Sequence, residues 1–369
     1  MSVASGTVPR AAARRAALRA LLPGAGVDAL LVTDLVNIRY LTGFTGSNAA
    51  LVVHADGDAA SRLCTDGRYR TQAADEVPDL ETVIDRASGL ALAGQVGALG
   101  VGRLGFESDS VTVDAHTALE AAAEGVELRR APGLVQLLRL VKDEGEVAAL
   151  RAACAAADAA LADLLAAGGL APGRTEREVA LDLETRMREH GAAGPAFETI
   201  VAAGAHSAIP HHRPTGAALA AGDFVKMDFG ALVDGYHSDM TRTVVLGRAA
   251  AWQRELYELV AAAQAAGRAG LAPGTAVSDV DAAARQVVAD AGRGAEFVHG
   301  LGHGVGLQIH EAPALAKTGT GTLAAGMVVT VEPGVYLEGR GGVRIEDTLV
   351  VRDGAPELLT CTTKELVEL

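Results

Sequence analysis

Two aspartates lie on a predicted hairpin. Residues 224–228 and 236–245 are apolar strands joined by an Asp-Gly dipeptide, which favours a tight type I′ turn. A two-residue turn would place Asp239 opposite Gly230, and therefore diagonal to Asp228 on the same face of the sheet. Diagonal neighbours lie roughly 7 to 8 Å apart. Two inward-pointing carboxylates at that separation repel each other unless a cation lies between them.

A second pair of carboxylates follows nearer the C-terminus. Glu332 ends an apolar strand, and Glu346 lies inside the predicted strand 343–351. Four converging carboxylates are too costly to bury without positive charge, and no Lys or Arg cluster of matching size lies in these strands. We therefore expect two divalent metal ions, about 3.5 to 4 Å apart and bridged by carboxylates.

Histidines are concentrated between these two pairs. His299, His303 and His310 lie in the stretch HGLGHGVGLQIHEAP, whose glycines permit close approach of a ligand or substrate. One histidine alone is more often a buried structural residue, but three beside four carboxylates favour a functional site. His211 and His212 form a weaker pair after a proline, and we interpret one of them as a loop residue.

An internal repeat gives the carboxylates a second reason to converge. The string LAPG occurs at residues 170–173 and again at 271–274, each time before a predicted helix. Further on, LAAGDFVKMDFG and LAAGMVVTVEPG align Asp228 with Glu332. We infer two αβ halves related by a pseudo-twofold axis.

Helices are predicted to flank these strands. A long Ala/Leu helix is expected from residue 143 to about 167. Thr175 and Glu178 predict a capping box for the next helix, and Ser278 or Thr275 is expected to cap its repeat mate.

The first third of the chain alternates helix and strand patterns. A helix near 11–22 is followed by short apolar strands at 27–33, 49–53 and 62–65, which indicates an α/β domain. The character of the sequence changes near Pro132. We assign two domains, residues 1–135 and 136–369.

Composition excludes several classes of partner. The chain has 369 residues and a formal net charge of -14, which argues against nucleic-acid binding. A short arginine cluster at 10–19 is expected to be the solvated face of the first helix. Proline and glycine interrupt the apolar stretch 16–32, so we expect no membrane span. Three separated cysteines suggest no disulfide framework, and we expect a cytoplasmic protein.

Several stretches resemble a known family. DFGALVDGYHSDMTRT, HGLGHGVGLQIHEAP, VEPGVY and RIED resemble the pita-bread metallopeptidases, in the branch of Xaa-Pro aminopeptidases and Xaa-Pro dipeptidases (prolidases). RYLTGFTGSNA and TDGRYRTQA are similar to the creatinase-type N-terminal domain of that branch. The resemblance implies an α/β creatinase-like N-terminal domain and an α+β pita-bread catalytic domain with a pseudo-twofold internal repeat.

The resemblance also implies a ligand set. The family's metal ligands fall on Asp228, Asp239, His303, Glu332 and Glu346. Asp239 and Glu346 are expected to bridge both ions. Because the set is rich in oxygen and contains a single imidazole, we expect manganese, with cobalt or zinc as alternatives.

Further positions of the family fall on His211, His299, His310 and Arg344. We expect Glu332 also to move a proton from the nucleophile to the leaving prolyl nitrogen. His299 and His310 are expected to steady the carbonyl oxygen and the tetrahedral intermediate, and His211 to line the proline side of the cleft. His212 departs from the family, which often has glycine or a small residue there.

The implied reaction is hydrolysis of the peptide bond before a proline. The stretches GFTGSNA and DGRYRTQA favour an Xaa-Pro aminopeptidase, our primary prediction, whereas the chain length favours the alternative, an Xaa-Pro dipeptidase. Methionine aminopeptidases usually lack the N-terminal domain, and creatinase lacks the ligands. A non-catalytic peptide-binding protein fits less well, because such relatives typically lose ligands. The resemblance further implies a homodimer that acts on proline-containing peptides.

Overall fold

The computed structural model describes residues 4–369, with side chains described from residue 10. The chain forms two compact units, Met1–Arg139 and Leu140–Leu369. Each unit has buried apolar clusters of its own.

A six-stranded mixed sheet forms the centre of the first unit, in the order β4-β3-β2-β1-β5-β6. Its strands are β1 Ala29–Val32, β2 Ala49–His54, β3 Arg62–Thr65, β4 Glu81–Ile84, β5 Arg103–Phe106 and β6 Glu127–Arg130. Its helices are α1 Ala4–Ala25, α2 Leu35–Thr42, α3 Arg70–Glu76, α4 Ser88–Ala93, α5 Val113–Ala122 and α6 Leu134–Arg139. Every residue of β1 and β2 is buried, which explains the apolar sequences ALLV of β1 and AALVV of the first five residues of β2. The predicted α/β class is confirmed.

The first half of the second unit packs two helices on an antiparallel sheet. Its elements are α7 Glu144–Ala166, α8 Glu176–Glu189, β7 Gly194–Pro195, β8 Ile200–Ala203, β9 Phe224–Phe229, β10 Ala231–Val233, β11 Tyr236–His237 and β12 Met240–Val245. Buried side chains of α7 and α8 form one apolar cluster with those of β8, β9 and β12.

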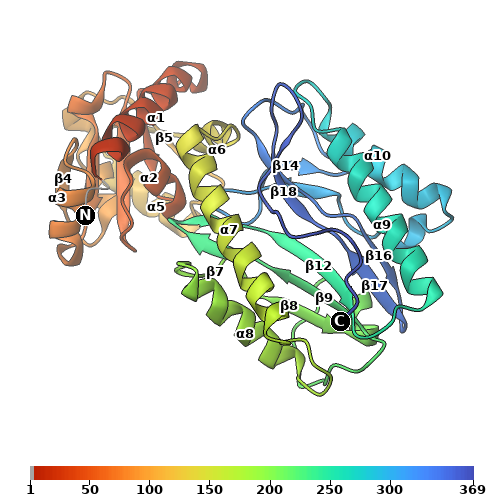
Figure 1. Cartoon of the computed structure of the whole chain (residues 1–369). Helices are drawn as coiled ribbons and strands as arrows, with labels where there is room; N and C mark the ends of the chain where they lie inside the picture. The colour runs from red at the N-terminus through yellow and green to blue at the C-terminus, as the bar shows by residue number, and fades with distance from the viewer. Residues whose placement is uncertain (1–3) are drawn as a thin grey trace. The chain divides into compact units, whose positions relative to one another are not determined.

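The second half repeats this plan. Its elements are α9 Ala251–Ala269, α10 Val277–Asp290, β13 Gly302–Gly304, β14 Glu311–Leu315, β15 Val328–Val331, β16 Gly334–Leu337, β17 Gly341–Arg344, β18 Asp347–Val350 and β19 Glu357–Leu358. Helices α9 and α10 share an apolar cluster with β15 to β18. Figure 1 shows α7 and α8 on one side of the strands and α9 and α10 on the other.

Backbone contacts confirm the internal repeat. The amide of Gly173 donates to the carbonyl of Leu219, and that of Gly274 donates to the carbonyl of Leu323, both at 2.8 Å. Isolated β-bridges join Thr175 to Ala218 and Ala276 to Thr322 in the same relative places. The LAPG and LAAG strings therefore mark equivalent contacts, as the sequence predicts.

The two repeat helices begin differently. Thr175 and Glu178 form the predicted capping box at the start of α8. The prediction that Ser278 or Thr275 caps α10 is wrong, because the N-cap is Ala276, which makes no side-chain cap. The amide of Val277 instead donates to the carbonyl of Gly321 at 3.2 Å, so a backbone oxygen takes the place of a side-chain cap at the start of α10.

The predicted strand 343–351 is also corrected. It divides into β17, which pairs with β16, and β18, which pairs with β15. Glu346 lies in the bend between them rather than inside a strand. The change of partner explains the break, because one straight strand cannot pair with both neighbours.

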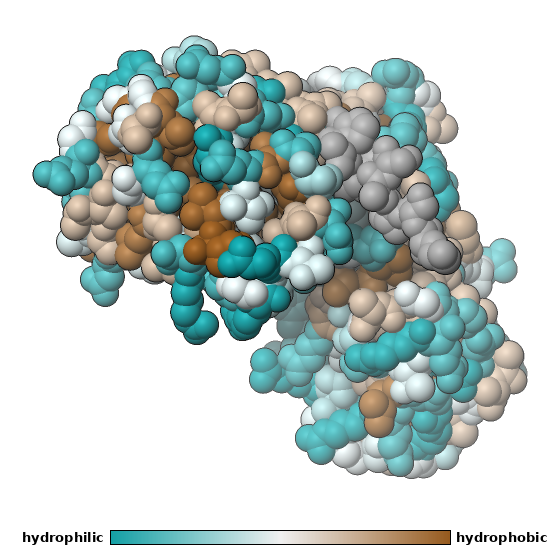
Figure 2. All heavy atoms as spheres, turned by 90° about the vertical axis from the view of Figure 1, so that its left-hand side faces the viewer, coloured by the Kyte–Doolittle hydropathy of each residue, from teal (hydrophilic) through white to brown (hydrophobic). Residues whose placement is uncertain are grey.

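No helix within residues 4–369 is long and apolar enough to cross a membrane. On the face shown in Figure 2, hydrophilic residues are spread widely, and hydrophobic residues lie among them in separate groups.

Candidate metal centre

The hairpin that carries two of the carboxylates has the predicted register. Both residues of its Asp-Gly turn have positive φ, 48° and 77°, as a type I′ turn requires. Strands β9 and β12 place Asp228 opposite Thr241. The same register places Asp239 opposite Gly230, and hence diagonal to Asp228. A Cβ atom at Gly230 would lie 1.8 Å from the carbonyl oxygen of Ser238, so only glycine fits this close approach.

The bend between β17 and β18 positions the other two carboxylates. Val331 pairs with Asp347, and Gly334 pairs with Arg344 on the far side of the bend. This register places Glu332 and Glu346 opposite each other. The amide of Glu332 donates to the carbonyl of Leu301 at 2.8 Å, which ties this strand end to the histidine segment.

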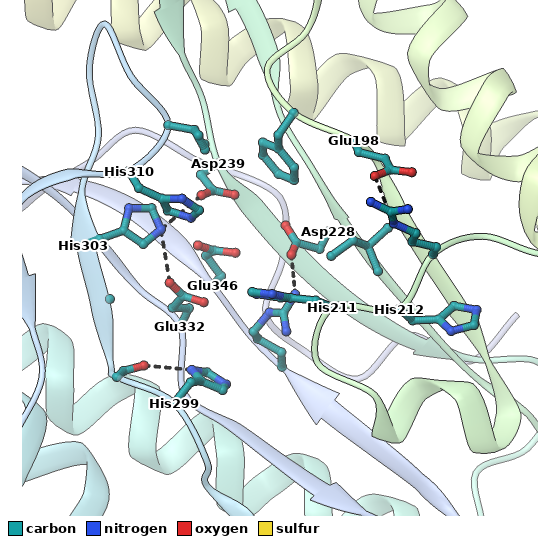
Figure 3. Close-up of a pocket in the computed structure, with 17 residues that line it drawn as sticks. Glu198, His211, His212, Asp228, Asp239, His299, His303, His310, Glu332 and Glu346 are labelled. Atoms are coloured by element: carbon teal, nitrogen blue, oxygen red, sulfur yellow. Dashed lines mark hydrogen bonds and ion pairs between the residues drawn. The ribbon is translucent and has the colours of Figure 1, made fainter. Parts of the chain in front are cut away.

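All the predicted site residues line one cavity of about 470 Å³. Figure 3 shows Asp239, His303, Glu332 and Glu346 directed toward one another, with Asp228 and His211 beside this group. The residues brought together are Asp228, Asp239, His303, Glu332, Glu346, His211, His299, His310 and Arg344. The structure therefore unites segments that are more than a hundred residues apart in sequence.

His303 lies beside three of the four carboxylates. Ligand atoms of Asp239, His303 and Glu346 all lie within 4.8 Å of one another. The Nε2 atom of His303 is 3.5 Å from Asp239 Oδ2 and 3.3 Å from Glu332 Oε1. Its Nδ1 atom contacts the carbonyl oxygen of Gly304 at 3.0 Å, which fixes the ring with Nε2 toward the carboxylates.

Other contacts hold the carboxylates and leave one oxygen atom of Asp228 without a partner among the described residues. Arg344 Nη2 pairs with Asp228 Oδ2, whereas Asp228 Oδ1 is buried without a hydrogen-bond partner in the described part of the chain. Thr241 Oγ1 donates to Glu346 Oε2 at 2.7 Å and accepts from Arg344 Nε at 2.9 Å. Buried polar atoms normally have partners, so the orphaned oxygen indicates a place for a cation.

The electrostatics of the cavity also fit a divalent ion. Burial raises the pKa of Asp239 and of Glu346, and the neighbouring carboxylates raise both further. Burial acts in the same direction on Glu332, but His303 and Arg344 outweigh it and lower the pKa of Glu332 to about 2. Such a set of oxygens with one imidazole suits divalent metal, which would stabilise every carboxylate in its charged form.

The histidines around the carboxylates differ in how they are held. His299 contacts the carbonyl oxygen of Gly300 through Nδ1 at 2.8 Å and the hydroxyl of Tyr336 through Nε2 at 2.9 Å. His310 is exposed to the cavity, and its ring meets that of His303 edge-on, with centroids 4.4 Å apart. Partial burial lowers the pKa of His310, and the neighbouring His303 lowers it further, which favours the neutral ring.

Sequence reasoning missed two residues beside the site. Tyr336 accepts a hydrogen bond from Arg344 Nη1 at 2.9 Å and so links that arginine to His299. Its signal was its place at the end of the stretch VEPGVY. Glu176 lies outside the carboxylate group and contacts His212 through a buried carboxylate. It gives no signal in the sequence beyond its place beside a capping residue.

Comparison with known proteins agrees with this geometry. Residues 148–353 match the model for metallopeptidase family M24, and residues 14–141 match the creatinase/prolidase N-terminal domain. The chain is 34% identical to an Xaa-Pro dipeptidase of Pyrococcus horikoshii over 92% of this chain and 95% of that protein.

Solved structures are similar over nearly the whole chain. An Xaa-Pro dipeptidase from Bacillus anthracis matches with a TM-score of 0.93 and 38% identity, covering 97% of this chain and 100% of that one. An X-Pro aminopeptidase from Thermotoga maritima matches with a TM-score of 0.87 and 32% identity, covering 93% and 98%. The chain therefore belongs to metallopeptidase family M24, in its Xaa-Pro peptidase branch, with a creatinase-type N-terminal domain before a pita-bread domain.

Proposed function

We propose that this protein is a metal-dependent Xaa-Pro dipeptidase that cleaves the bond between a first residue and a following proline. The observation that carries the proposal is the convergence of four carboxylates and His303 in one cavity of an Xaa-Pro peptidase fold. Relatives named Xaa-Pro dipeptidase support this substrate class better than the aminopeptidase of our primary prediction. Xaa-Pro aminopeptidase activity is the second candidate, because the chain is also similar to an X-Pro aminopeptidase from Thermotoga maritima.

We assign two divalent ions to this cavity, held by Asp228, Asp239, His303, Glu332 and Glu346. The close group of Asp239, His303 and Glu346 supports one position, and the buried Oδ1 of Asp228, which has no hydrogen-bond partner among the described residues, supports a neighbouring one. Asp239 and Glu346 are the proposed bridging ligands. The oxygen-rich set favours manganese, with cobalt or zinc as alternatives. When bound, the ions act as Lewis acids that activate the attacking water and polarise the scissile carbonyl.

Glu332 is the proposed proton carrier. His303 and Arg344 lower the pKa of Glu332, so its carboxylate is ionised at neutral pH. We propose that this carboxylate accepts a proton from the attacking water. Thr330 Oγ1 donates to Glu332 Oε1 at 3.2 Å and helps to orient it. The proton then passes to the prolyl nitrogen, which has no N–H in the peptide and must gain a proton to leave.

The remaining side chains position and stabilise the substrate. His310 lines the cavity with an exposed ring and can donate an N–H to the oxygen of the tetrahedral intermediate. Both ring nitrogens of His299 contact other protein atoms. We therefore propose that His299 holds Tyr336, and through it Arg344, in position. His211 lines the cavity on the side proposed for the proline ring.

The test compares hydrolysis of an Xaa-Pro dipeptide, an Xaa-Pro-Yyy tripeptide and an Xaa-Ala dipeptide by manganese-loaded protein. We expect turnover of the first substrate only. Efficient cleavage of the tripeptide before proline would favour the aminopeptidase, and cleavage of Xaa-Ala alone would exclude both. The homodimer and the cytoplasmic location stay predictions, which sedimentation and fractionation can address.

A further inference from the structure

A short segment brings His211 to the cavity. Residues 209–215, called the strap here, follow the 3₁₀ turn Gly204–Ala208 and contribute His211, His212 and Arg213 to the cavity lining. Figure 3 shows His211 beside Asp228, whereas His212 points away from the carboxylates. No hydrogen bond from the imidazole of His211 is found within the described residues, so its position depends on the backbone that carries it.

Two buried basic side chains hold the strap before His211. Lys226 Nζ donates to the carbonyl oxygens of Ile209 at 2.6 Å and Pro210 at 3.2 Å. Arg344 Nη1 also donates to the carbonyl of Pro210 at 3.2 Å. The side chains of Lys226 and Arg344 are almost completely buried, so these contacts are shielded from water.

A buried carboxylate holds the strap after His211. Glu176, the first residue of α8, is completely buried. Its Oε2 atom contacts His212 Nε2 at 2.9 Å and accepts from the amide and hydroxyl of Thr215 at 2.9 and 2.7 Å. Its Oε1 atom accepts from the amide of Ala203 and contacts His206 Nδ1, both at 2.9 Å. A helix N-terminus also favours the charged carboxylate.

We propose that Glu176 and His212 are positioning residues that hold His211 in the substrate cavity. His211 lies between two fixed neighbours, the carbonyl of Pro210 and the side chain of His212. Removing the contact between Glu176 and His212 frees the part of the strap that follows His211, so the imidazole of His211 can move out of the cavity. The inference rests on the proposed function, because it assumes that His211 contacts the substrate.

The same cluster could instead be considered as ligands for an ion, since atoms of Glu176, His206 and His212 lie within 4.8 Å of one another. The two imidazoles, however, stack with centroids 4.4 Å apart and address different oxygens of the carboxylate. Those oxygens also accept hydrogen bonds from the backbone amides of Ala203 and Thr215. Hydrogen bonding alone satisfies the carboxylate, so the geometry favours an anchor.

A double-mutant cycle tests the anchor. His212→Phe keeps a ring but removes the nitrogen that contacts Glu176, and we expect kcat/KM for an Xaa-Pro dipeptide to fall at least tenfold. In the His211→Ala background the same change should cost less than twofold. His206→Phe is the matched control, because it removes the contact on the other oxygen outside the strap, and it should change kcat/KM less than twofold. His212→Gln, whose amide can donate to Glu176, should restore most of the activity.

A second readout does not require turnover. In metal-free protein labelled with ¹⁵N-histidine, the ring signals of His211 should shift or broaden in His212→Phe and stay unchanged in His206→Phe. Equal losses of activity in both His211 backgrounds, or equal effects of the two phenylalanine variants, would overturn the anchor. A wild-type protein that cleaves no Xaa-Pro peptide would refute the proposed function, and the His211 signals would then decide the anchor alone.

Discussion

Asp228 and Arg344 form a buried ion pair through Oδ2 and Nη2, and this pair leaves Asp228 Oδ1 buried without a hydrogen-bond partner among the described residues. The arginine thus balances one aspartate without occupying the atom proposed to bind metal. Its other nitrogens donate to Thr241, Tyr336 and Pro210. Arg344 therefore connects three segments around the cavity.

Replacing this arginine should destabilise the metal-free protein. Arg344→Met leaves Asp228 buried without its counter-charge, and we expect a loss of about 3 to 5 kcal/mol in the free energy of unfolding. Urea titration in EDTA and in manganese measures the loss, which should be smaller with metal. Arg248→Met, a change at an exposed arginine, is the control. Equal stability of the two variants would contradict the structural role of the pair.

Asp239→Asn should abolish metal loading and activity. The amide removes one charge from a ligand proposed to bridge both ions, while its size preserves the packing. We expect metal content, measured by mass spectrometry, and kcat/KM to fall by at least about a hundredfold, with an unchanged circular dichroism spectrum. Asp279→Asn, on the exposed side of α10, is the control and should retain the metal content and kcat/KM of the wild type. A fully loaded and active Asp239→Asn variant would refute the bridging assignment.

His310→Ala should separate catalysis from metal binding. Loss of one donor to the tetrahedral intermediate is expected to lower kcat by about 10² to 10³-fold. The metal content should stay close to that of the wild type, because His310 is not among the proposed ligands. Parallel measurement of kcat and bound metal checks this. An equal loss of both would identify His310 as a ligand.

Glu107 predicts a pH dependence of stability in the first unit. Burial raises the pKa of Glu107 from 4.5 to about 7, although the amides of Thr33 and Asp34 and the side chain of Asn37 donate to it. The folded unit therefore retains a proton that the unfolded chain has released, and stability should fall as pH rises from about 4.5 to about 7. Linkage gives a change on the order of 3 kcal/mol.

Chemical denaturation of the wild type and Glu107→Gln between pH 4.5 and 7.5 measures this change. The glutamine variant should lack that part of the pH dependence, because it carries no titrating proton. Identical pH profiles would show that the three donors keep Glu107 ionised throughout. Glu124→Gln, at an exposed position of the same unit, controls for a general effect of charge.

Local chemistry explains what the sequence could predict. The Asp-Gly turn determines the register of its hairpin, so the diagonal relation of Asp228 and Asp239 followed without a structure. The repeated LAPG and LAAG strings likewise predicted the two related halves of the second unit, because they form the same backbone contact in each half.

Contacts between residues distant in sequence explain the features that the sequence could not predict. The break at Glu346 arises from two strands that pair with different neighbours, and the cap of α10 comes from the carbonyl of Gly321. Glu176 contacts residues 27 to 39 positions away, from Ala203 to Thr215. Its role depends on tertiary packing and leaves no local pattern.

The tight hairpin between the two aspartates restricts how this enzyme can change in length. Side chains alternate between the faces of a strand, so inserting or deleting one residue between the turn and Asp239 would direct its carboxylate away from Asp228. Such a lesion would remove the metal centre while leaving every ligand residue in the gene. In a variant library, single-codon insertions at this point should therefore behave like loss of a ligand, whereas similar insertions in exposed loops of the first unit should be tolerated.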